Sequence, residues 1–260
     1  MAKLRTNYIF LRKMIGKNTI KWVHSLEMKK NRKREGLFVA EGPKVVGDLL
    51  SRFRLHTVFA TEEWNGGGKL GAEVRRHTVD DDELRRLSFL QHPQQVVAVF
   101  EMNNEDEVKV DKDRLTIMLD GVQDPGNLGT IIRIADWFGI DSIICSPDTA
   151  DAYNPKVVQA TMGSLGRVRV TYSQLTPLLS SINGEMPIYG TLLDGKDIYQ
   201  TELTQRGIII MGNEGNGISE EVRKMVTHPI LIPRFRQGES AESLNVAVAT
   251  AITCSEFCRR

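Results

Sequence analysis

The chain has few of the residues that mark disulfide-stapled, metal-binding or membrane-spanning proteins. Its 260 residues include only three cysteines, Cys145, Cys254 and Cys258, with no Cys-x-x-Cys pair among them. Such a set predicts neither a disulfide framework nor a cysteine zinc site. The histidines lack metal-ligand spacing, so we expect no metal. No apolar run approaches the ~20 residues that span a bilayer, and the first residues lack the layout of a signal peptide, so we expect a cytoplasmic protein.

Several common catalytic and nucleotide-binding motifs are missing as well. There is no GxSxG nucleophile elbow and no GxxxxGK[ST] phosphate loop, and the glycine-rich segment 212–217 has the spacing GxxGxG instead of GxGxxG. These absences argue against a serine hydrolase, a P-loop enzyme and a dinucleotide-dependent oxidoreductase. The oxidoreductase stays open as a competing interpretation only because strands and helices alternate along the chain.

The length predicts two domains. Residues 1–102 have the pattern of a small α/β unit, and 103–113 are polar, charged and almost without apolar side chains, so we expect a linker there. The expected elements of the first unit are helices at 17–34, 43–52 and 79–89 and strands at 36–42, 55–61 and 95–102.

Residues 114–260 alternate short apolar strands with amphipathic helices. This alternation predicts an α/β domain with a mostly parallel sheet that is covered on both faces. Gly139 is suited to end the first of its helices in the left-handed conformation. The expected strands are 114–120, 141–146, 167–173, 187–193, 206–212 and 228–233, and the expected helices are 127–138, 154–163, 174–183, one from about 219, and 243–257.

An overall charge of +1 conceals a strong asymmetry along the chain. Residues 1–54 contain 14 Lys and Arg against 4 Asp and Glu, a net charge of +10, whereas the remainder has a net charge of −9. A basic front end favours a polyanionic partner such as RNA, although a charge run alone is as often a solvated surface. Trp22 and Phe53 lie beside cations, which suits stacking on bases. The residues predicted to contact RNA are Lys21, Lys29, Lys30, Arg32, Lys33 and Arg34.

Three widely separated segments place polar or glycine-rich residues directly after an apolar run. They are 119–139, 208–221 and 231–252. Ligands bind at the carboxyl ends of strands in open α/β sheets. The three segments therefore predict one site that folding assembles.

In the first segment, Arg133 interrupts an almost entirely apolar helix, and Asn127 is placed to cap that helix. A guanidinium buried among apolar side chains requires a partner, because an unpaired buried charge is very costly. Two interpretations stay open: a role in handling an anionic ligand, or a structural ion pair with one of Asp120, Asp124 and Glu214.

The second and third segments add further polar candidates. Glu214 is an acid among glycines that let the backbone approach a ligand closely. Ser243 has the simple interpretation of a helix cap. Asn245 lies within a run that is otherwise VAVATAI, and because Asn is a poor helix former, we expect it to have a specific hydrogen-bonding role.

Together these segments resemble the SpoU (TrmH-like) branch of the SPOUT RNA methyltransferases. DPGNLGTIIRIADWFG, GIIIMGNEGNGIS and IPRFRQGESAESLNVAVATAI are similar to its three motifs in order, and NTIKWVHSLEMKKNRKREGLFVAEGPKVV resembles its L30e-like RNA-binding domain. The resemblance implies an S-adenosylmethionine-dependent ribose 2′-O-methyltransferase with a deep carboxy-terminal trefoil knot. It also implies a homodimer with residues of both subunits near the active site.

By position in the motifs, the resemblance implies roles for individual residues. Arg133 would help to activate the ribose hydroxyl, Asn127 would support its placement, and Glu214, Ser243 and Asn245 would complete the catalytic set. Arginine is too basic to be a general base, so it would act by lowering the pKa of the hydroxyl or by directing a substrate phosphate oxygen to take the proton. The cofactor would lie against Thr191, Leu192, Gly212, Asn213, Gly217, Leu231, Ile232 and Leu244.

Two departures from the family pattern concern packing and RNA contact. The third motif is longer than usual between Pro233 and Ser243 and carries Arg234 and Arg236, and Gly166 stands where an aromatic residue is often found. The front domain favours ribosomal RNA over transfer RNA as substrate. The alternative is a non-catalytic RNA-binding or ribosome assembly factor on the same fold.

Overall fold

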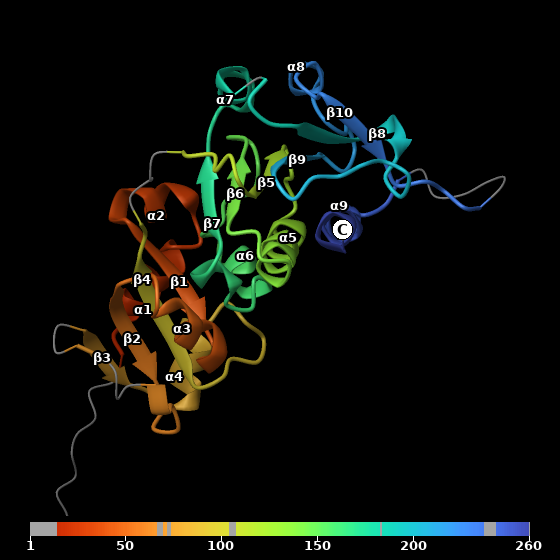
Figure 1. Ribbon diagram of the computed structural model, residues 1–260. Coiled ribbons are helices and arrows are strands. Elements are labelled where there is room, and N and C mark those ends of the chain that lie inside the picture. The colour runs from red at the N-terminus through yellow and green to blue at the C-terminus, as the bar shows by residue number, and fades with distance from the viewer. Residues whose placement is uncertain are drawn as a thin grey trace, which may run out of the picture.

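The computed structural model of the chain describes residues 15–66, 70–71, 74–103, 108–182, 184–236 and 243–259. Two β-sheets with their helices form two bodies that lie side by side, the amino-terminal one coloured red to yellow and the carboxy-terminal one green to blue (Figure 1). Among the described helices, none combines the length and the apolar composition needed to cross a bilayer.

The amino-terminal part, residues 15–101, contains a four-stranded sheet. Its elements are α1 Lys17–Ser25, α2 Lys29–Glu35, β1 Leu37–Glu41, α3 Pro43–Leu49, β2 Leu55–Ala60, β3 Arg75–Thr78, α4 Asp81–Leu87 and β4 Val96–Glu101. The strand order is β1-β4-β2-β3, with β1 and β2 antiparallel to β4 and β3 parallel to β2.

Local chemistry explains most of these boundaries. Asp80 and Glu83 form a capping box that starts α4, as an acidic helix start predicts. Gly36 adopts φ +67° and ends α2, a conformation that suits glycine. The single helix expected over 17–34 is wrong, because Met28 is extended and separates α1 from α2. β3 was not predicted, since its four residues, RRHT, are all exposed and show no apolar alternation.

The carboxy-terminal part, residues 115–259, contains a six-stranded sheet in which every described pairing is parallel, which confirms the predicted α/β class. The strand order is β10-β8-β9-β5-β6-β7. Its elements are β5 Leu115–Asp120, α5 Pro125–Trp137, β6 Ser142–Cys145, α6 Pro155–Ala160, the 3-10 helix η2 Ser164–Gly166, β7 Arg169–Tyr172, α7 Leu175–Ser181, β8 Ile188–Asp197, β9 Gly207–Gly212, α8 Glu220–Arg223, β10 His228–Leu231 and α9 Val246–Arg259.

The strands of this sheet are buried on both faces. On β5, Ile117 and Leu119 join the core beneath α5 and α9, whereas Met118 joins the core on the opposite face with Leu175 and Leu179 of α7. Each fully buried side chain of this size contributes roughly 1.5–3 kcal/mol relative to exposure. Burial on both sides explains why these strands have continuous apolar runs and no alternation.

The two parts share one apolar core. The side chains of Phe38, Val46 and Leu49 belong to the same buried cluster as those of Ile131 and Val157. Tyr153, which follows β6, packs against Phe38 with ring centroids 4.8 Å apart and edge-on against Phe53 at 6.0 Å. Such an apolar junction holds the two parts in one relative orientation.

A buried ion pair crosses the same junction. Arg32 of α2 is 1% exposed, and its guanidinium donates to Asp151 at 2.5 Å and to the carbonyls of Leu26 at 2.8 Å and Glu27 at 2.6 Å. Asp151 therefore neutralises a charge that would otherwise be costly to bury.

Gly166 is also explained by this junction. A Cβ on Gly166 would lie 2.7 Å from the carbonyl oxygen of Asp48 in α3, and one on Gly163, which has φ +98°, would meet the Asp48 side chain at 2.3 Å. A larger side chain at position 166 would push α3 away, so the departure from the family pattern permits close docking of the two parts.

The segment expected to be a linker is only partly described. Residues 104–107 lie outside the described ranges. Beyond them, Val108 and Val110 pack against the core cluster that contains Met118, and Lys112 forms an ion pair with Glu185 at 2.6 Å. Residues 108–112 are therefore attached to the carboxy-terminal part.

Candidate active site

The candidate site lies where the strand order of the six-stranded sheet reverses. From β5 the chain adds β6 and β7 on one side, and β8, β9 and β10 then fill the other side. The reversal falls between β5 and β9, whose last residues, Asp120 and Gly212, are paired in register. Ligands in open α/β sheets bind beyond the carboxyl ends of strands at this point.

The loops that leave β5 and β9 are joined by hydrogen bonds. The Asn213 side-chain amide donates to the carbonyl of Gly121 at 2.7 Å. Its oxygen accepts from the backbone of Gly215 at 2.9 Å and of Asn216 at 3.0 Å. The carboxylate of Asp120 accepts from the backbone N–H of Ser219 at 2.7 Å. The first two motifs therefore form one rigid unit.

The glycines of the second loop have two different functions. Gly212 has no room for a Cβ, which would lie 2.3 Å from the backbone of Gly217. The loop thus closes on itself, and Asn213 and Gly217 exchange two backbone hydrogen bonds of 2.9 Å. The sequence predicted that Gly212 lets the backbone approach a ligand closely. In the structure, Gly212 instead approaches Gly217 of the same loop. Gly217 has φ +70°, and a Cβ there would meet no atom of the described residues within 4 Å.

One hydrogen-bonded chain links a side chain from each of the three motifs. Asn127 donates through Nδ2 to Oε1 of Glu214 at 2.7 Å, and its Oδ1 accepts from Nδ2 of Asn245 at 2.8 Å. An ionised carboxylate can only accept, so Glu214 fixes the orientation of the Asn127 amide. The predicted meeting of these three residues is present in the structure.

The helix caps differ from those predicted. Asp124, not Asn127, caps α5, and its carboxylate accepts from the backbone of Asn127 at 2.7 Å. Asn245, not Ser243, caps α9, because its Oδ1 accepts from Ala247 at 3.0 Å and Val248 at 3.2 Å. Ser243 is exposed, and its side chain has no hydrogen bond to any other described residue. Asp124 therefore frees the Asn127 side chain for the site.

Arg133 is exposed, so the premise that it is a buried charge is wrong. Its predicted structural partners have other tasks: Asp120 binds Ser219, Asp124 caps α5 and Glu214 binds Asn127. Within the described ranges no acidic residue pairs with Arg133. The structural ion pair considered for it is therefore absent from this part of the chain.

Apolar side chains are exposed near Arg133. Trp137, one turn further along α5, is 84% exposed. Helix α9 packs against α5 and carries Val248, which is 49% exposed.

The strands β8 and β9, which carry several of the predicted cofactor residues, stop pairing before either strand ends. β8 pairs with β9 only as far as Gly190, opposite Ile210, whereas β9 continues along β5 to Gly212. On the other side, β10 pairs with Tyr189 and Gly190 and then with Lys196 and Asp197. In the described registers, residues 191–195 thus have no strand partner, although Gly195 lies close to the backbone of Ile230, where a Cβ would be 2.5 Å away.

The side chains of the predicted cofactor residues suit a cofactor with apolar and polar parts. Thr191 donates to the carbonyl of Ile210 at 3.2 Å. Leu192, Leu231 and Ile232 are half-buried, and Leu244 is 49% exposed. Few polar side chains and many backbone groups are typical of small-molecule sites. The residues present fit S-adenosylmethionine, with apolar surface for its adenine and backbone groups for its polar atoms.

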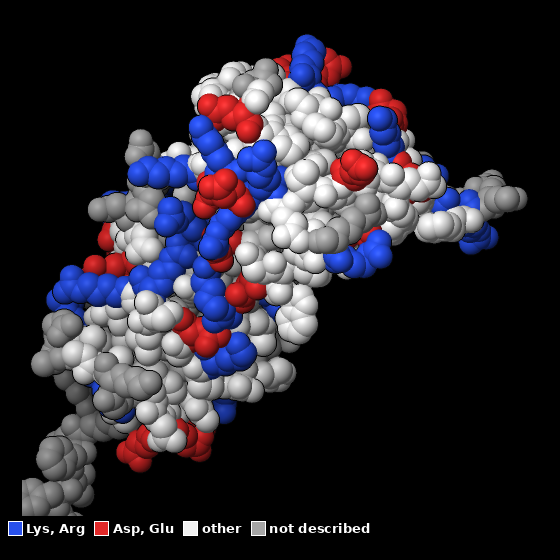
Figure 2. Space-filling view, in the orientation of Figure 1, with Lys and Arg blue, Asp and Glu red and all other residues white. Residues whose placement is uncertain are grey.

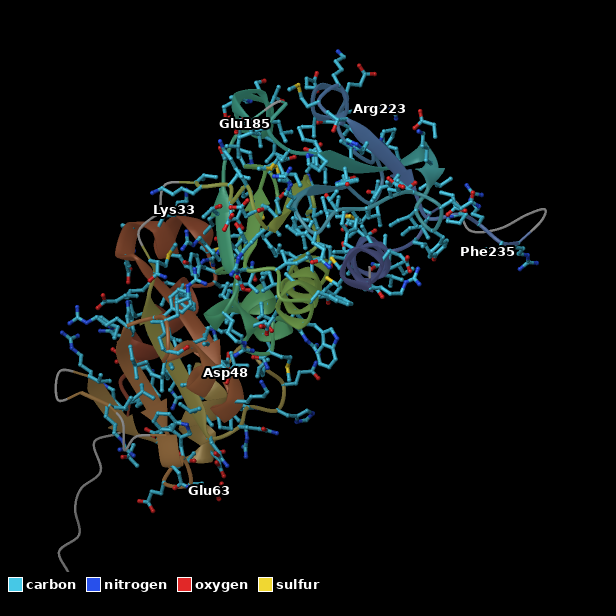
Figure 3. The ribbon with its side chains drawn as sticks, viewed as in Figure 1. Lys33, Asp48, Glu63, Glu185, Arg223 and Phe235 are labelled. Atoms are coloured by element: carbon cyan, nitrogen blue, oxygen red, sulfur yellow. The ribbon has the colours of Figure 1, made fainter. Side chains whose placement is uncertain are left out.

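The cationic residues of the amino-terminal part divide into two groups. Lys33 projects from α2 into solvent (Figure 3). Arg32 is buried at the junction, so the prediction that it contacts RNA is wrong. Phe53 is also buried, and the prediction that it stacks on bases is wrong. The exposed cations predicted to contact RNA are Lys21, Lys29, Lys30, Lys33 and Arg34.

Lysine and arginine side chains gather over the region of α2 and continue beside it along the middle of the same face, with acidic side chains among them (Figure 2). Lys29 lies 5.9 Å from the ring centroid of Tyr172, a cation–π contact between the two parts. Arg34 pairs with Glu35 at 2.9 Å and, with the hydrogen bond that it donates, lowers the pKa of that carboxyl.

A loop that the sequence analysis did not single out connects α2 with the site. Asp151, the partner of Arg32, lies between β6 and α6. In the same loop Ala150 donates to the carbonyl of Val122 at 2.9 Å, and Ser146 Oγ accepts from Gly121 at 2.9 Å. The signal that could have found this loop is its position, since polar residues follow the apolar strand β6 as in the three motifs.

The longer third motif is only partly described. Arg234 and Arg236 are exposed, while 237–242 lie outside the described residues. Phe235 is 83% exposed and lies on the opposite side of the molecule from Lys33 (Figure 3).

Comparisons with known proteins agree with this geometry. Residues 114–255 match the SpoU rRNA methylase family, and residues 17–98 match the MRM3-like substrate binding domain. The 23S rRNA (guanosine(2553)-2′-O)-methyltransferase RlmP of Bacillus subtilis is 33% identical over 231 residues, which cover 87% of this chain and 90% of that protein.

Two solved structures share the arrangement of both parts. A protein from Porphyromonas gingivalis that is assigned to the TrmH family of RNA methyltransferases superposes with a TM-score of 0.87 at 40% identity, covering 95% of this chain and 99% of that one. An AdoMet-bound rRNA methyltransferase from Sinorhizobium meliloti has a TM-score of 0.83 at 28% identity and covers 94% of this chain and 95% of its own.

Proposed function

Because the chain belongs to the SpoU rRNA methylase family, we propose that it transfers a methyl group from S-adenosylmethionine to a ribose 2′-hydroxyl of ribosomal RNA. The observation that carries the proposal is the chain Glu214–Asn127–Asn245, which brings one side chain from each motif to the strand ends where a ligand binds. The relatives named above include a 23S rRNA ribose methyltransferase, which favours ribosomal RNA over transfer RNA.

The residues that would hold the cofactor are Thr191 and Leu192, Gly212, Asn213 and Gly217, and Leu231, Ile232 and Leu244. The end of β8–β9 pairing at Gly190 and the free space at the Cβ position of Gly217 support this assignment. When bound, S-adenosylmethionine supplies an electrophilic methyl group.

The side chains of this protein prepare the ribose oxygen. A ribose hydroxyl is a poor nucleophile, so its proton has to leave as the oxygen attacks. The Arg133 guanidinium stabilises negative charge on that oxygen, or holds a substrate phosphate whose oxygen takes the proton. Asn127, held by Glu214 and Asn245, supports its placement, and the hydroxyl of Ser243 is available to the substrate.

The active site is completed in a homodimer. Trp137 and Val248 are exposed on α5 and α9, and Arg133 lies on the same helix as Trp137 without an acidic partner among the described residues. A symmetric interface over these helices would bury the apolar side chains and set Arg133 beside a site of the second subunit. A deep trefoil knot in the carboxy-terminal part is included in this proposal, as the family resemblance implies.

The amino-terminal part binds the RNA. We assign residues 1–102 to an RNA-binding domain, 103–113 to the connection and 114–260 to the methyltransferase domain. Lys21, Lys29, Lys30, Lys33 and Arg34 would contact phosphates, which supply most of the affinity for RNA. A ribosomal RNA substrate implies that the enzyme works in the cytoplasm.

The proposal is tested by transfer of labelled methyl from S-adenosylmethionine into total RNA from a strain that lacks this protein, followed by mapping of 2′-O-methyl positions. A labelled ribose in ribosomal RNA is the expected result. Binding of the cofactor without transfer to any RNA or ribosomal particle would instead support the alternative, a non-catalytic RNA-binding or assembly factor.

Arg133→Ala separates chemistry from cofactor binding. Because Arg133 acts on the ribose oxygen, we expect transfer to fall by about 100-fold or more, a loss of ~2.7 kcal/mol of transition-state stabilisation, with the affinity for S-adenosylmethionine nearly unchanged. Arg169→Ala is the matched control, since Arg169 is an exposed arginine on the edge strand β7. Loss of cofactor binding in Arg133→Ala would contradict the assignment.

A further inference from the structure

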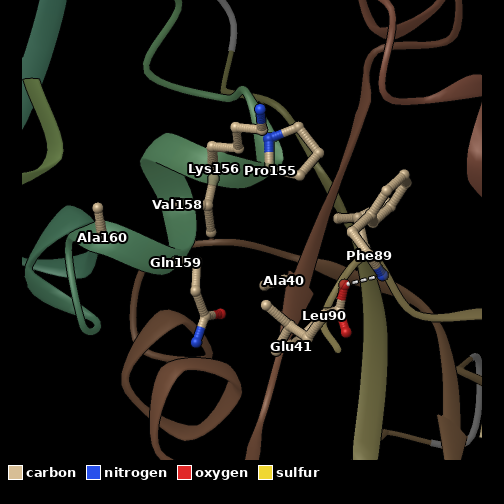
Figure 4. A pocket seen from close by; sticks show the side chains of 10 residues that line it. Ala40, Glu41, Phe89, Leu90, Pro155, Lys156, Val158, Gln159 and Ala160 are labelled. Atoms are coloured by element: carbon tan, nitrogen blue, oxygen red, sulfur yellow. Dashed lines mark hydrogen bonds between the residues drawn. The ribbon is translucent and has the colours of Figure 1, made fainter. Parts of the chain in front are cut away.

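A pocket of about 300 Å³ lies between the two parts of the molecule. Pro155, Lys156 and Gln159 of α6 form one wall, and Glu41, Phe89 and Leu90 of the amino-terminal part form the other (Figure 4). Its volume is at the lower end of the range for small-molecule sites, and its lining is mostly apolar with a few polar groups, as in such sites. The pocket exists only because the two parts are docked.

A buried carboxylate is the first polar group of this pocket. Glu41, at the end of β1, is 5% exposed, and its oxygens accept hydrogen bonds from Ser88 Oγ and from the backbone of Phe89 at 2.8 Å. Burial raises the pKa of this carboxyl. A carboxylate can accept about four hydrogen bonds, so capacity remains for a donor in the pocket.

The opposite wall offers a side-chain amide. Gln159 is half-buried, and its amide has no hydrogen bond to any other described residue. A half-buried amide without a protein partner forms fewer hydrogen bonds to water than an exposed amide does. A polar ligand bound in the pocket would supply the missing hydrogen bonds. Lys156, on the same helix α6, is exposed and supplies a positive charge at the rim.

The pocket is close to the catalytic helix. Ala160, which also lines the pocket, packs directly on Gly129 of α5, where a Cβ would lie only 2.4 Å from the Ala160 Cβ. Gly129 is two positions after Asn127 in the same helix. Packed helices lie about 8–10 Å apart, a distance that a short stretch of single-stranded RNA spans.

We propose that this pocket, which adjoins the helix of Asn127 and joins both domains, binds an unstacked nucleobase of the RNA substrate near the methylated nucleotide. Proteins recognise single-stranded RNA by splaying out bases, packing them against apolar and aromatic side chains and hydrogen-bonding their edges. Phe89 and Pro155 provide the packing, and Lys156 meets the neighbouring phosphate. Glu41 accepts from an exocyclic amine, so adenine, guanine and cytosine are preferred over uracil. The location beside a methylated nucleotide rests on the proposed function, whereas the binding of a base does not.

The site is tested with the four nucleoside 5′-monophosphates as probes. Saturation-transfer NMR is recorded on the full chain with excess S-adenosylhomocysteine, which keeps the nucleotides out of the cofactor site. Gln159→Trp fills the pocket from the α6 wall. Gln174→Trp, at an exposed position before α7, is the matched control. Glu41→Gln keeps the size of the side chain but removes its charge and half of its acceptor capacity.

We expect AMP, GMP or CMP to receive saturation in the wild type and in Gln174→Trp, and to lose it in Gln159→Trp. UMP should be weaker, and Glu41→Gln should reduce the difference between UMP and the other three. Absence of saturation for all four nucleotides, or equal saturation in Gln159→Trp, would overturn the proposal, even if Glu41→Gln fails to fold.

Methyl transfer to RNA provides an independent readout. Gln159→Trp should raise the KM for RNA by about tenfold, with kcat within about twofold of wild type, because the pocket binds a part of the substrate that does not react. If the KM of Gln159→Trp for RNA equals that of the wild type, the proposed nucleobase site is wrong and the proposed function is unaffected. Binding of mononucleotides by a wild type that methylates no RNA would overturn the proposed function and leave the nucleobase site.

Discussion

Asn127 connects two side chains that lie far from it in the sequence, and the direction of each hydrogen bond follows from the next. Glu214 can only accept, so it binds the NH₂ group of Asn127, whose oxygen then faces the NH₂ group of Asn245. The oxygen of Asn245 is left to cap α9. The carboxylate of Glu214 thus orients the side-chain amides of Asn127 and Asn245 and, through Asn245, the cap of α9.

This direction predicts that Asn127→Asp is as harmful as Asn127→Ala. The carboxylate introduced by the first substitution would face that of Glu214, and repulsion would break the chain that the amide completes. We expect kcat to fall by about 100-fold in both variants, with cofactor affinity within about threefold of wild type. The measurement is single-turnover methyl transfer together with cofactor titration. Full activity of Asn127→Asp would show that the direction of the chain is irrelevant.

Asp136 gives a pH dependence of stability. Burial raises the pKa of its carboxyl, but hydrogen bonds from Arg167 and Ser164 outweigh burial and lower it. Asp136 is therefore more acidic in the folded than in the unfolded protein. It contributes stability at pH values above the ordinary aspartate pKa of about 3.9, and this contribution is lost as the pH falls through the folded value.

We expect Asp136→Asn to reduce the free energy of unfolding at pH 7 by on the order of 1 kcal/mol, since the Arg167 pair is partly solvated. The difference from wild type should shrink as the pH falls below about 4, where the carboxyl of the unfolded chain is protonated. Urea unfolding at a series of pH values measures both. Asp141→Asn is a suitable control, because the ion pair of Asp141 with Arg114 is largely exposed. A difference that grows toward low pH would contradict the assigned direction.

At the scale of elements, α2 has two faces with different tasks. Arg32 is buried and pairs with Asp151, whereas Lys33, the next residue, is exposed. The sequence KKNRKR does not reveal this division, because a basic run in a short helix has no apolar pattern that would mark its buried side.

Substitutions of Arg32 and of Lys33 should therefore have different effects, the first on stability and the second on RNA binding. Arg32→Met leaves Asp151 without its partner and should cost about 3–5 kcal/mol of stability, part of which Asp151→Asn restores in the double variant. Lys33→Ala should leave stability unchanged and reduce the dependence of log affinity for RNA on log salt by roughly 0.7–0.9. Chemical unfolding and RNA binding at several salt concentrations measure the two effects. A stable Arg32→Met variant with weakened RNA binding would reverse the assignment.

The elements that the sequence predicted well are those whose burial has a simple pattern. The continuous apolar runs of β5 and β9 predicted central parallel strands, and Gly139 ends the α5 region with φ +69° as expected. The predicted cap of α5 is wrong, because Asp124 and Asn127 are both good cap residues and the sequence does not distinguish them. Only the fold shows that the Asn127 side chain is hydrogen-bonded to Glu214, which leaves Asp124 to cap the helix. The strand β3 lacks apolar residues, so the alternation of apolar and polar residues that predicts a strand is absent from it.

The whole molecule should unfold as one unit. The shared core and the packing of Tyr153 between Phe38 and Phe53 couple the two parts. We expect a single thermal transition that coincides for circular dichroism and tryptophan fluorescence. Tyr153→Ala should remove several kcal/mol of packing at the junction and separate the two transitions. Tyr199→Ala, at a position 38% exposed, is the control. Two transitions in the wild type would show that the parts are independent.

At this scale the three strand ends predicted that the three motifs meet, as they do through Asn127, but nothing in the sequence predicted how the two parts dock. The junction depends on Asp151, Tyr153 and Gly166, which are ordinary residues of loops and turns until α3 and α2 are brought against them. Long-range contacts of this kind leave no local pattern, whereas strand ends do. For the same reason, the apolar residues next to Arg133 in the sequence predicted that it is buried, although it lies on the exposed side of α5.

The docking of Tyr153 and the pair Arg32–Asp151 has a consequence for substrate choice. The junction holds α2 and α5 in one arrangement, so the interval between the exposed cations of α2 and the amide of Asn127 is fixed. Under the proposed function, this interval would select RNAs in which the anchoring backbone and the reactive ribose have a matching spacing. An RNA with the same bases in a longer or shorter arrangement would then be a poor substrate.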